Sequence, residues 1–398
     1  MSLLRRLVGP SETRAVTESA FAPPPSQTGL VHSGEPVTER SALSLVAYYA
    51  AVRLLADTVA SLPWDAFRSR GGRQVELDPA PALLRDPYQM LTAYEWKHQM
   101  MVSLAMRGNF YGLIVERDWL EFPTQIQPLH PDWVLREYER RGGRPTGNVI
   151  TRVLGEPVPE RDLFHVRGFT PPGSPDGLSP IELARHSIGL GLATQRYGSS
   201  WFRDGAAPSG QLITDQELNQ EQITRNQEQW VATHGGRRLP AVMTGGMKYE
   251  PISITPEESQ FLQTRDFTIK EMAMLVGVPP HMIGDVERST SWGTGIEQQS
   301  IGFVTYNLRS WLTSVEAAMS KWLLPRGQHV RFNVDALLRG DLKSRYEAYR
   351  VALEAGFKNP DEIRALEDLE PIPGGAGQQF RQPLNFGPLG QEATDDEA

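Results

Sequence analysis

The sequence contains no cysteine among its 398 residues. This excludes disulfide bonds, thiolate metal ligands and cysteine nucleophiles, and it is typical of a protein made in a reducing cytosol. No apolar run approaches the roughly 18–20 residues that a membrane-spanning helix needs. Residues 1–8 are too short and too interrupted by charge to be a signal peptide. We therefore expect a soluble protein that is made in the cytoplasm and has no membrane partner.

The chain also lacks the motifs of the common catalytic sites. It has no phosphate-binding loop of the form GxxxxGKS/T, no GxGxxG dinucleotide motif, no HExxH pair and no EF-hand loop. His234-Gly235-Gly236 is similar to the oxyanion strand of esterases, but no GxSxG motif supplies a nucleophile. No two of the eight histidines stand at a helical metal-ligand spacing. We predict no catalytic residue, no metal site and no cofactor.

A surplus of positive charge is missing as well. The formal net charge is −8, and four of the negative charges lie in the last eight residues, 391–398, so the rest is close to balance. Proteins that hold nucleic acid through many phosphate contacts usually carry a basic surplus. The charge therefore argues against tight binding of nucleic acid.

Proline, serine, glycine and threonine are concentrated at the two ends of the chain. Residues 1–40 show no hydrophobic periodicity, and we expect a flexible arm there. For the same reason we expect a disordered tail over residues 373–398. The structured part of the chain should lie between these two segments.

The first half of that structured part combines helix and strand patterns. Residues 41–61 carry an apolar face at steps of three and four, ended by Pro63, and a second helix is predicted over 92–107. Strand-like segments separated by turn residues follow to about residue 169. We predict one mixed α+β domain over residues 41–178. The predicted apolar face of the first helix consists of Leu45, Tyr48, Val52, Leu55 and Val59.

Three later helices begin with the same signal, a capping residue followed by proline and then glutamate. These starts are Ser179-Pro180-Ile181-Glu182, Thr255-Pro256-Glu257-Glu258 and Asn359-Pro360-Asp361-Glu362. The first two predict helices over 179–205 and 255–280. Between them, residues 206–254 read as strand, helix, strand and strand, which predicts a small α/β module.

A row of small residues follows one face of the 179–205 helix at steps of three and four. Small side chains let helix backbones approach closely. The row is consistent with packing against a neighbouring subunit and equally with tight packing inside the same domain. Its members are Ala184, Ser187, Gly191, Thr194 and Gly198.

The longest helix pattern comes after an irregular segment, residues 281–295. Within residues 296–335 the apolar positions hold steps of three and four until Pro325, which predicts about thirty helical residues, roughly 45 Å at 1.5 Å each. Helices near 341–355 and 360–369 complete a predicted region over 336–372. The predicted apolar positions of the long helix are Ile301, Val304, Leu308, Trp311, Val315, Met319 and Trp322.

The order of these elements resembles the portal proteins of tailed bacteriophages, in the compact form found in long-tailed phages. Each matching fragment is short, but they occur in the order of that family. The fragments are residues 51–63, 108–111, 129–131, 177–181, 202–210, 265–267 with 276–280, and 297–298.

The resemblance implies a ring of usually twelve subunits at one capsid vertex, with an α+β wing, a helical stem, a small α/β clip, a long wing helix and a helical crown. The stem would comprise 179–205 and 255–280, the clip 206–254, the wing 41–178 with 296–335, and the crown 336–372. Balanced charge suits such a channel, because tight phosphate contacts would oppose sliding DNA. In this interpretation the small row on the first stem helix packs between subunits.

The resemblance also implies partners. Double-stranded DNA would pass through the ring, the large terminase subunit and then the head–tail adaptor would dock on the clip, and the major capsid protein or scaffold would hold the wing. The protein would belong to the virion, after assembly in the host cytoplasm. The alternatives are another capsid-associated structural protein, such as an adaptor or a capsid subunit, and a packaging hydrolase, which the missing phosphate loop disfavours.

Residues 281–295 would form a tunnel loop beside the DNA. An arginine there could meet phosphate and hydroxyls could bond weakly, although Trp292 could instead anchor the loop to its neighbour. Arg265 and Lys270 would face the channel from the second stem helix, or pair with Glu258 or Glu271. The candidate DNA-facing residues of the loop are Arg288, Ser289, Thr290, Ser291 and Trp292.

Overall fold

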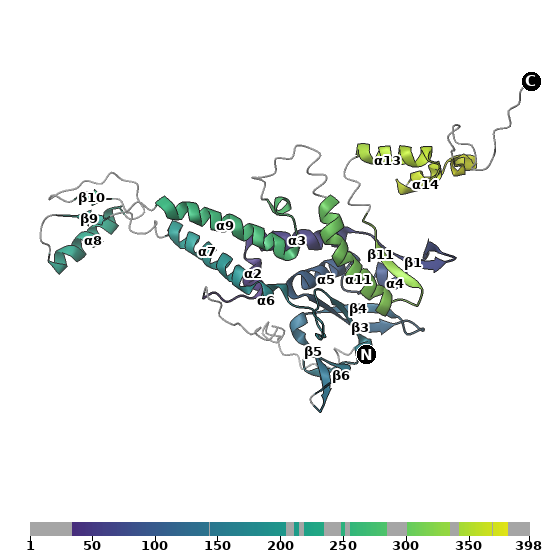
Figure 1. Ribbon diagram of the computed structural model, residues 1–398, viewed down its shortest axis with the longest axis horizontal. Coiled ribbons are helices and arrows are strands. Elements are labelled where there is room, and N and C mark those ends of the chain that lie inside the picture. Colours follow the sequence, from purple (N-terminus) through teal and green to yellow (C-terminus); the bar gives the residue numbers. More distant parts are fainter. Residues whose placement is uncertain are drawn as a thin grey trace, which may run out of the picture. The chain divides into compact units, whose positions relative to one another are not determined.

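The computed structural model describes residues 34–142, 144–203, 211–214, 219–234, 248–250, 255–284, 301–334, 342–367 and 369–380. It is a mixed helix and sheet protein, as predicted (Figure 1). The chain divides into two compact units, Met1–Phe332 and Asn333–Ala398. Across the described residues, no helix is both long and apolar enough to cross a membrane.

Helix α3 (Val46–Ser61) carries the predicted apolar face. Leu45, Tyr48, Val52, Leu55 and Val59 are all at most 6% exposed. The helix ends at Leu62, whose backbone is extended immediately before Pro63. The prediction for this segment is confirmed.

The expectation of a flexible arm up to residue 40 is wrong for its last part. Helix α2 (Glu39–Leu43) begins with a capping box between Thr38 and Ser41, and Val37 is buried. Glu35 is also buried, and its carboxylate is paired with Arg196. The ion pair of Glu35 with Arg196 and the burial of the Val37 side chain hold this segment in place. Residues 1–33 lie outside the described part.

Helix α5 (Ala93–Arg107) is fixed at both ends. Thr92 and Glu95 form a capping box at its start, and Gly108 ends it in the left-handed conformation, with φ 68°. The chain then enters β3, the central strand of an antiparallel sheet of order β4-β3-β8. The strands of this sheet are β3 (Asn109–Arg117), β4 (Pro123–Leu129) and β8 (Leu163–Arg167).

Two further sheets complete the first half. The sheet β11-β1-β2 combines β1 (Trp64–Arg70) and β2 (Arg73–Glu76) with a late strand, β11 (Gln328–Phe332). The sheet β5-β6-β7 is built on a long hairpin. Its strands are β5 (Val134–Arg141), β6 (Arg144–Val153) and β7 (Glu156–Pro157), and short helices α4 (Ala82–Arg85), η2 (Pro131–Trp133) and η3 (Glu160–Asp162) join the strands.

Aromatic side chains connect α5 to two of these sheets. Trp96 of α5 lies 5.9 Å from Trp64 of β1 and 5.1 Å from Phe110 of β3, between ring centroids. Phe110 in turn contacts Phe164 of β8 at 6.2 Å, and Trp64 contacts Phe332 of β11 at 5.8 Å. Tilted and edge-on contacts at these distances are favourable for aromatic rings. This row of rings is the centre of the core.

The predicted helix over 179–205 is two helices, so its expected continuity is wrong. Helix α6 (Pro180–Leu183) ends at Ala184, whose φ of −94° and ψ of 16° interrupt the helix, and α7 (Arg185–Arg203) follows. Ser179 caps α6 as predicted, but the capping box is incomplete, because the Glu182 carboxylate turns toward Arg107 instead. The break accompanies a change of partner, since α6 packs against α5 whereas α7 packs against α9.

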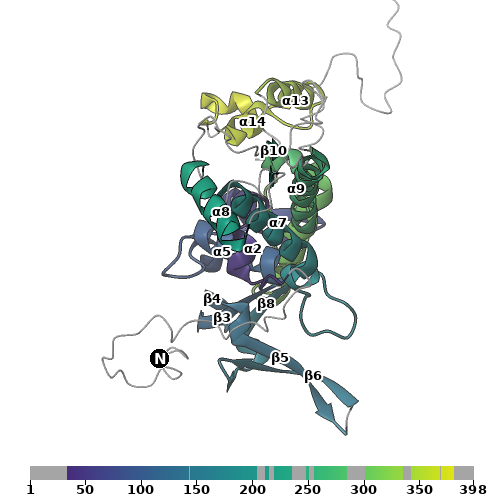
Figure 2. The ribbon, with the colours of Figure 1, turned by 90° about the vertical axis from the view of Figure 1, so that its left-hand side faces the viewer.

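Helix α9 (Thr255–Val276) ends at Gly277, where φ is 78°. Helices α7 and α9 lie side by side (Figures 1 and 2). A 3-10 turn, η4 (Pro280–Ile283), follows α9. Between the two helices the described residues form β9 (Gln211–Ile213), α8 (Gln220–His234) and β10 (Lys248–Glu250), with β9 antiparallel to β10. The predicted strand at 241–244 lies outside the described part.

The predicted long helix is not α-helical throughout. Residues 303–308 form a π-helix, η5 (Phe303–Leu308), which continues into α11 (Arg309–Trp322). The buried side chains are Phe303, Leu308, Leu312, Val315 and Met319, whereas Ile301 and Trp322 of the predicted face are exposed. The step of five from Phe303 to Leu308 spans the π-helix, whose wider turn moves the buried face. The earlier part, residues 285–300, is not described.

The second unit contains α13 (Leu342–Glu354) and α14 (Pro360–Leu366). Asn359 and Glu362 form the predicted capping box at the start of α14. The expectation of disorder from residue 373 is wrong for its first residues, because η6 (Pro373–Gln378) is a short helix and Gly377 is buried. The backbone N–H of Ile372 donates to Asp361 of α14 at 2.8 Å, which holds this segment.

Candidate functional site

The α7–α9 pair is held together by small and polar side chains. The Ser187 hydroxyl donates to a Glu271 carboxylate oxygen at 3.5 Å. At Gly191, an added Cβ atom would lie 2.9 Å from a Thr268 methyl carbon and 3.2 Å from Leu45. Because the residue numbers fall along α9 as they rise along α7, the two helices are antiparallel. A larger residue at position 191 would have to displace the Thr268 or Leu45 side chain.

These contacts bear on the two interpretations of the small-residue row on α7 at two of its positions. Ser187 and Gly191 face α9 of the same chain, so for them packing between subunits is replaced by packing inside the domain. Gly198 is buried as well, and Thr194 donates its hydroxyl to the Leu190 carbonyl of its own helix at 2.8 Å. Ala184 is the residue at which α6 ends. Packing between subunits at Ala184, Thr194 and Gly198 stays a prediction.

The charged candidates of α9 have different surroundings. Arg265 is exposed, and Lys270 forms an ion pair with Asp266 one turn earlier. Neither position is defined relative to a channel, so the role of Arg265 and Lys270 stays a prediction. The candidate tunnel-loop residues Arg288, Ser289, Thr290, Ser291 and Trp292 lie outside the described part of the chain.

The segment that leads into α6 meets the start of β3 at a close backbone contact. The Asn109 side chain donates to the Gly177 carbonyl and accepts from the Gly177 N–H, each at 2.7 Å. A Cβ atom on Gly108 would lie 2.0 Å from the Leu178 carbonyl oxygen, and one on Gly177 would lie 2.3 Å from the Gly108 carbonyl oxygen. Two glycines and one asparagine therefore join the sheet to the helix that follows.

Arg107, at the end of α5, is the first of two arginines that tie separate segments to this junction. Its guanidinium donates to Glu39 of α2 and, at 2.6 Å, to Asp132 of η2, and it lies 4.0 Å from Glu182 of α6. Its side chain is only 11% exposed. Burial raises the pKa of Glu39, but hydrogen bonds from His130 and Arg107 outweigh that effect and lower it to about 2.

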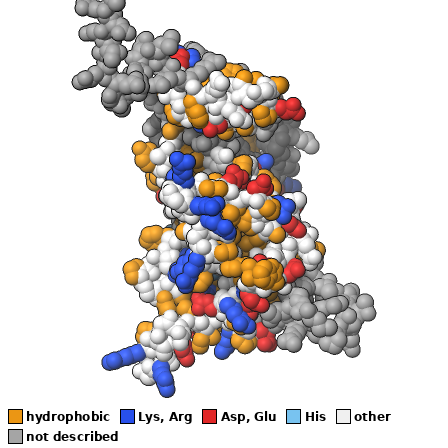
Figure 3. All heavy atoms as spheres, turned by 90° about the vertical axis from the view of Figure 1, so that its right-hand side faces the viewer, with side chains coloured by type: hydrophobic (Ala, Val, Ile, Leu, Met, Phe, Trp, Pro, Cys, Tyr) orange, Lys and Arg blue, Asp and Glu red, His pale blue; other side chains and the backbone are white. Residues whose placement is uncertain are grey.

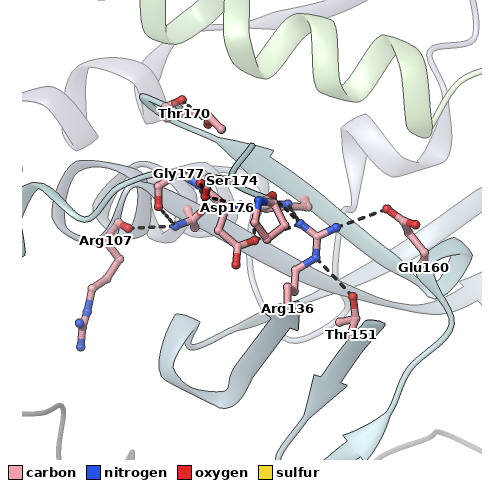
Figure 4. A network of polar contacts seen from close by, with 12 residues as sticks. Arg107, Arg136, Thr151, Glu160, Thr170, Ser174, Asp176 and Gly177 are labelled. Carbon is pink, nitrogen blue, oxygen red and sulfur yellow. Dashed lines mark hydrogen bonds and ion pairs between the residues drawn. The ribbon is translucent and has the colours of Figure 1, made fainter. Parts of the chain in front are cut away.

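Arg136 of β5 is the second (Figure 4). Its guanidinium donates to His165 of β8 at 2.6 Å and to Asp176 at 3.0 Å, and it pairs with Glu160 at 3.3 Å. His165 Nε2 lies 3.0 Å from the Asn109 side-chain oxygen. Burial, with the charge of Arg136 nearby, lowers the pKa of His165 to about 2, so the imidazole is neutral. It therefore accepts from Arg136 and donates to Asn109.

The sequence reasoning did not single out Arg107 or Arg136. One signal was nevertheless present, because three of the fragments that carry the resemblance meet here: 108–111, 129–131 and 177–181. Where segments far apart in the chain meet closely, small residues and helix caps are needed at the point of contact. Arg107 and Asp132 directly adjoin these fragments in the sequence, and in the structure they form an ion pair.

The charged groups of the site are held in ion pairs and hydrogen bonds. Among the described residues, no group of three histidine, cysteine or acidic side chains is placed to hold a metal ion. On the face drawn in Figure 3, basic and acidic side chains are interspersed rather than gathered by sign. The buried charges described above are paired, which gives them a structural role.

Comparison with known proteins assigns the chain. A model of the family described as "Phage portal protein" matches residues 46–368. The chain belongs to the phage portal protein family. A Streptomyces phage phiC31 protein described as "Probable portal protein" is 38% identical over 380 residues, 90% of this chain and 82% of that protein. The portal protein of Enterobacteria phage HK97 is 30% identical over 380 residues, 88% of this chain and 86% of that protein.

Solved structures agree on the portal fold. A chain from the virion of a native gene transfer agent (GTA) particle has a TM-score of 0.58 and 23% identity, over 84% of this chain and 95% of that chain. An HK97 family phage portal protein from Corynebacterium diphtheriae gives 0.55 and 17%, over 77% and 98%. The neck of a native GTA particle, computed with C12 symmetry, gives 0.56 and 22%, over 84% and 95%. The fold class expected from the sequence is confirmed.

Proposed function

We propose that this chain is the subunit of a ring, most simply of twelve copies, that forms the portal at one vertex of a phage or phage-like capsid. Double-stranded DNA enters and leaves the particle through this ring. The observation that carries the proposal is the portal family match over residues 46–368. The likeness to a GTA neck computed with C12 symmetry supports the ring and its number of copies.

In this proposal α7 and α9 are the stem, and the protein has no catalytic role. The stem holds Arg265 and Lys270 toward the channel, and residues 288–292 form the tunnel loop that DNA passes. The balanced charge supports a channel that lets DNA slide, because many phosphate contacts would hold it. The energy for packaging comes from a separate terminase.

The clip residues, 206–254, are the docking surface for the large terminase subunit and later for the head–tail adaptor. Helix α8 supports this role, because Glu221, Gln222, Thr224, Arg225 and Glu228 are exposed polar side chains on it. The wing contacts the major capsid protein or the scaffold. The protein is located in the virion, and in the host cytoplasm during assembly.

The decisive experiment is electron microscopy of the purified chain, with the rotational symmetry of class averages counted. Rings of about twelve copies with a central hole are the expected result, alone or after production together with the capsid proteins. A compact dimer without a hole under both conditions would contradict the proposal. It would favour a capsid-associated protein that forms no channel.

The role of the tunnel loop has its own test. Deleting residues 286–294 should leave ring formation intact and impair DNA packaging or retention, measured as DNA per purified particle. Normal DNA content in particles that carry the deletion would refute the loop assignment while leaving the ring in place.

A further inference from the structure

The outer side of the α7–α9 pair exposes large apolar side chains. Leu190 and Tyr197 of α7 are 47% and 49% exposed, and Phe267 and Met274 of α9 are 56% and 64% exposed. Each helix carries its two residues seven positions apart, a spacing that returns to nearly the same side of a helix after two turns. We call these four residues the stem apolar face.

The four residues belong to one surface. Leu190 directly precedes Gly191, and Phe267 directly precedes Thr268, and Gly191 and Thr268 are in contact across the pair. In each helix the preceding residue is rotated by about 100° from the contact. Because the two helices are antiparallel, this rotation carries both side chains to the same side of the pair. Leu190 and Phe267 also lie at nearly the same level, since both adjoin one contact.

The other side of the pair is already covered by the same chain. Helix α3 packs along α9, and Leu45, just before α3, reaches Gly191. Met272, Ala273 and Val276 are buried there. Among the described side chains of α7 and α9, the large apolar residues left exposed therefore include the four of the stem apolar face.

The polar groups beside the stem apolar face are already bonded. Thr194 donates to the Leu190 carbonyl, and Ser187 donates to Glu271. A partner that covers this face therefore need not supply hydrogen bonds to these two hydroxyl groups, which lowers the cost of burying it. Tyrosine, phenylalanine and methionine are also among the residues enriched at protein interfaces.

The size of the face suits part of a subunit contact. Taking about 200 Å² for a fully exposed side chain of this size, the four residues expose on the order of 400 Å². That equals the largest apolar patch of many monomers, and such patches are often binding sites. A standard interface buries about 800 Å² on each partner, so the face would supply roughly half.

We propose that the stem apolar face is the surface by which each subunit packs against the next copy in the ring. The proposal rests on the ring proposed above and names the part of the stem that forms it. The occupant is a second copy because the C12 neck, whose chain is aligned over 95% of its length, requires contacts between copies. Ring contacts are heterologous, so the face packs on a different surface of its neighbour.

The test compares Leu190→Glu and Phe267→Glu with Leu135→Glu, a control of similar exposure at 53% on strand β5. Mass photometry of a dilution series measures the concentration at which rings fall apart. We expect that concentration to rise about tenfold or more for the two stem variants, as for a central interface residue, and to stay at the wild-type value for the control. Unchanged thermal unfolding of the three isolated subunits shows that the fold is kept.

Three outcomes would overturn the assignment: rings of both stem variants as resistant to dilution as wild type, equal loss in the control, or unfolding of the stem variants as isolated subunits at wild-type conditions. If wild-type protein forms no ring alone or in particles, the proposed function itself fails. If wild-type rings form and the variants behave like wild type, only the assignment of this face fails.

Because the natural chain has no cysteine, a single Leu190→Cys substitution identifies the occupant. We expect a maleimide reagent to label it in the separated subunit and to react at least tenfold more slowly in the ring, whereas Leu135→Cys labels equally in both. Protection already present in the separated subunit, and lost when residues 1–33 are deleted, would show that the chain's own N-terminal segment covers the face. That outcome would overturn the proposal.

Discussion

Replacing Arg107 should destabilise the first unit far more than replacing another ion-paired arginine on a neighbouring helix. Arg107 is 11% exposed and holds Glu39 and Asp132, whereas Arg53 of α3 is 63% exposed and pairs only with Asp57. Removing one partner of a buried pair leaves an uncompensated charge, which costs about 3–5 kcal/mol. A solvent-exposed pair contributes little, so Arg53→Met should leave stability nearly unchanged.

The pKa of Glu39 gives a second measure of this cluster, to which His130 and Arg107 both contribute. The pKa of Glu39 falls from 4.5 to about 2, with burial opposing the shift and the bonds from His130 and Arg107 producing it. A shift of this size corresponds to about 3 kcal/mol. Because the folded-state pKa is the lower one, this stability is present above pH 4.5 and is lost as the pH falls toward about 2. At neutral pH the full contribution is in place.

Urea unfolding followed by tryptophan fluorescence measures this unit alone, because all nine tryptophans lie before residue 333. Arg107→Met keeps most of the side-chain volume, and we expect it to lose about 3 kcal/mol of unfolding free energy at pH 7. Adding Glu39→Gln and Asp132→Asn should restore part of the loss, since the uncompensated charges disappear. Equal losses for Arg107→Met and Arg53→Met would refute the reasoning, as would a triple variant no more stable than Arg107→Met.

Two further predictions use the same fluorescence assay. The pKa of His165 is about 2 in the folded state against 6.5 unfolded, so stability should fall by about 1.4 kcal/mol for each pH unit below 6.5. His165→Gln, which can keep both hydrogen bonds, should remove that pH dependence. An unchanged slope in this variant would argue against a buried neutral histidine. Gly108→Ala should lower the free energy of unfolding clearly more than Gly155→Ala, because both glycines have positive φ but only Gly108 has the Leu178 carbonyl where the Cβ would lie. The backbone strain shared by both variants is worth about 1–2 kcal/mol. Equal losses of unfolding free energy would show that the close contact at Gly108 is relieved at little cost.

Local signals in the sequence predicted much of the fold. The apolar spacing on α3 and the capping residues before α6 and α14 act within one or two turns, and the structure has these elements where the signals indicate. The π-helix at 303–308 could not be read in this way. Steps of three and four suit both an α-helix and a helix with one wider turn, and only the packing of Phe303 against the core distinguishes them.

The junction around Gly108 and Gly177 was not predicted from the sequence. Nothing in the local pattern indicates that residues sixty-eight positions apart, such as Asn109 and Gly177, exchange two hydrogen bonds. Arg107 and Arg136 are ordinary arginines by sequence, and their partners come from four or more separate segments. Long-range pairing of charges depends on the completed fold, which single-sequence periodicity does not contain.

The small-residue row on α7 shows that one sequence pattern is compatible with two different partners. Small side chains indicate that two backbones approach closely, but the requirement is the same inside a subunit and between subunits. The contact of Gly191 with Thr268 satisfies it within the chain. What distinguishes an intermolecular surface is large apolar area left exposed after the chain has folded. On α7 that exposed apolar area includes Leu190, the residue next to Gly191. The subunit contact that we propose therefore lies on the side of the stem adjoining the Gly191 contact.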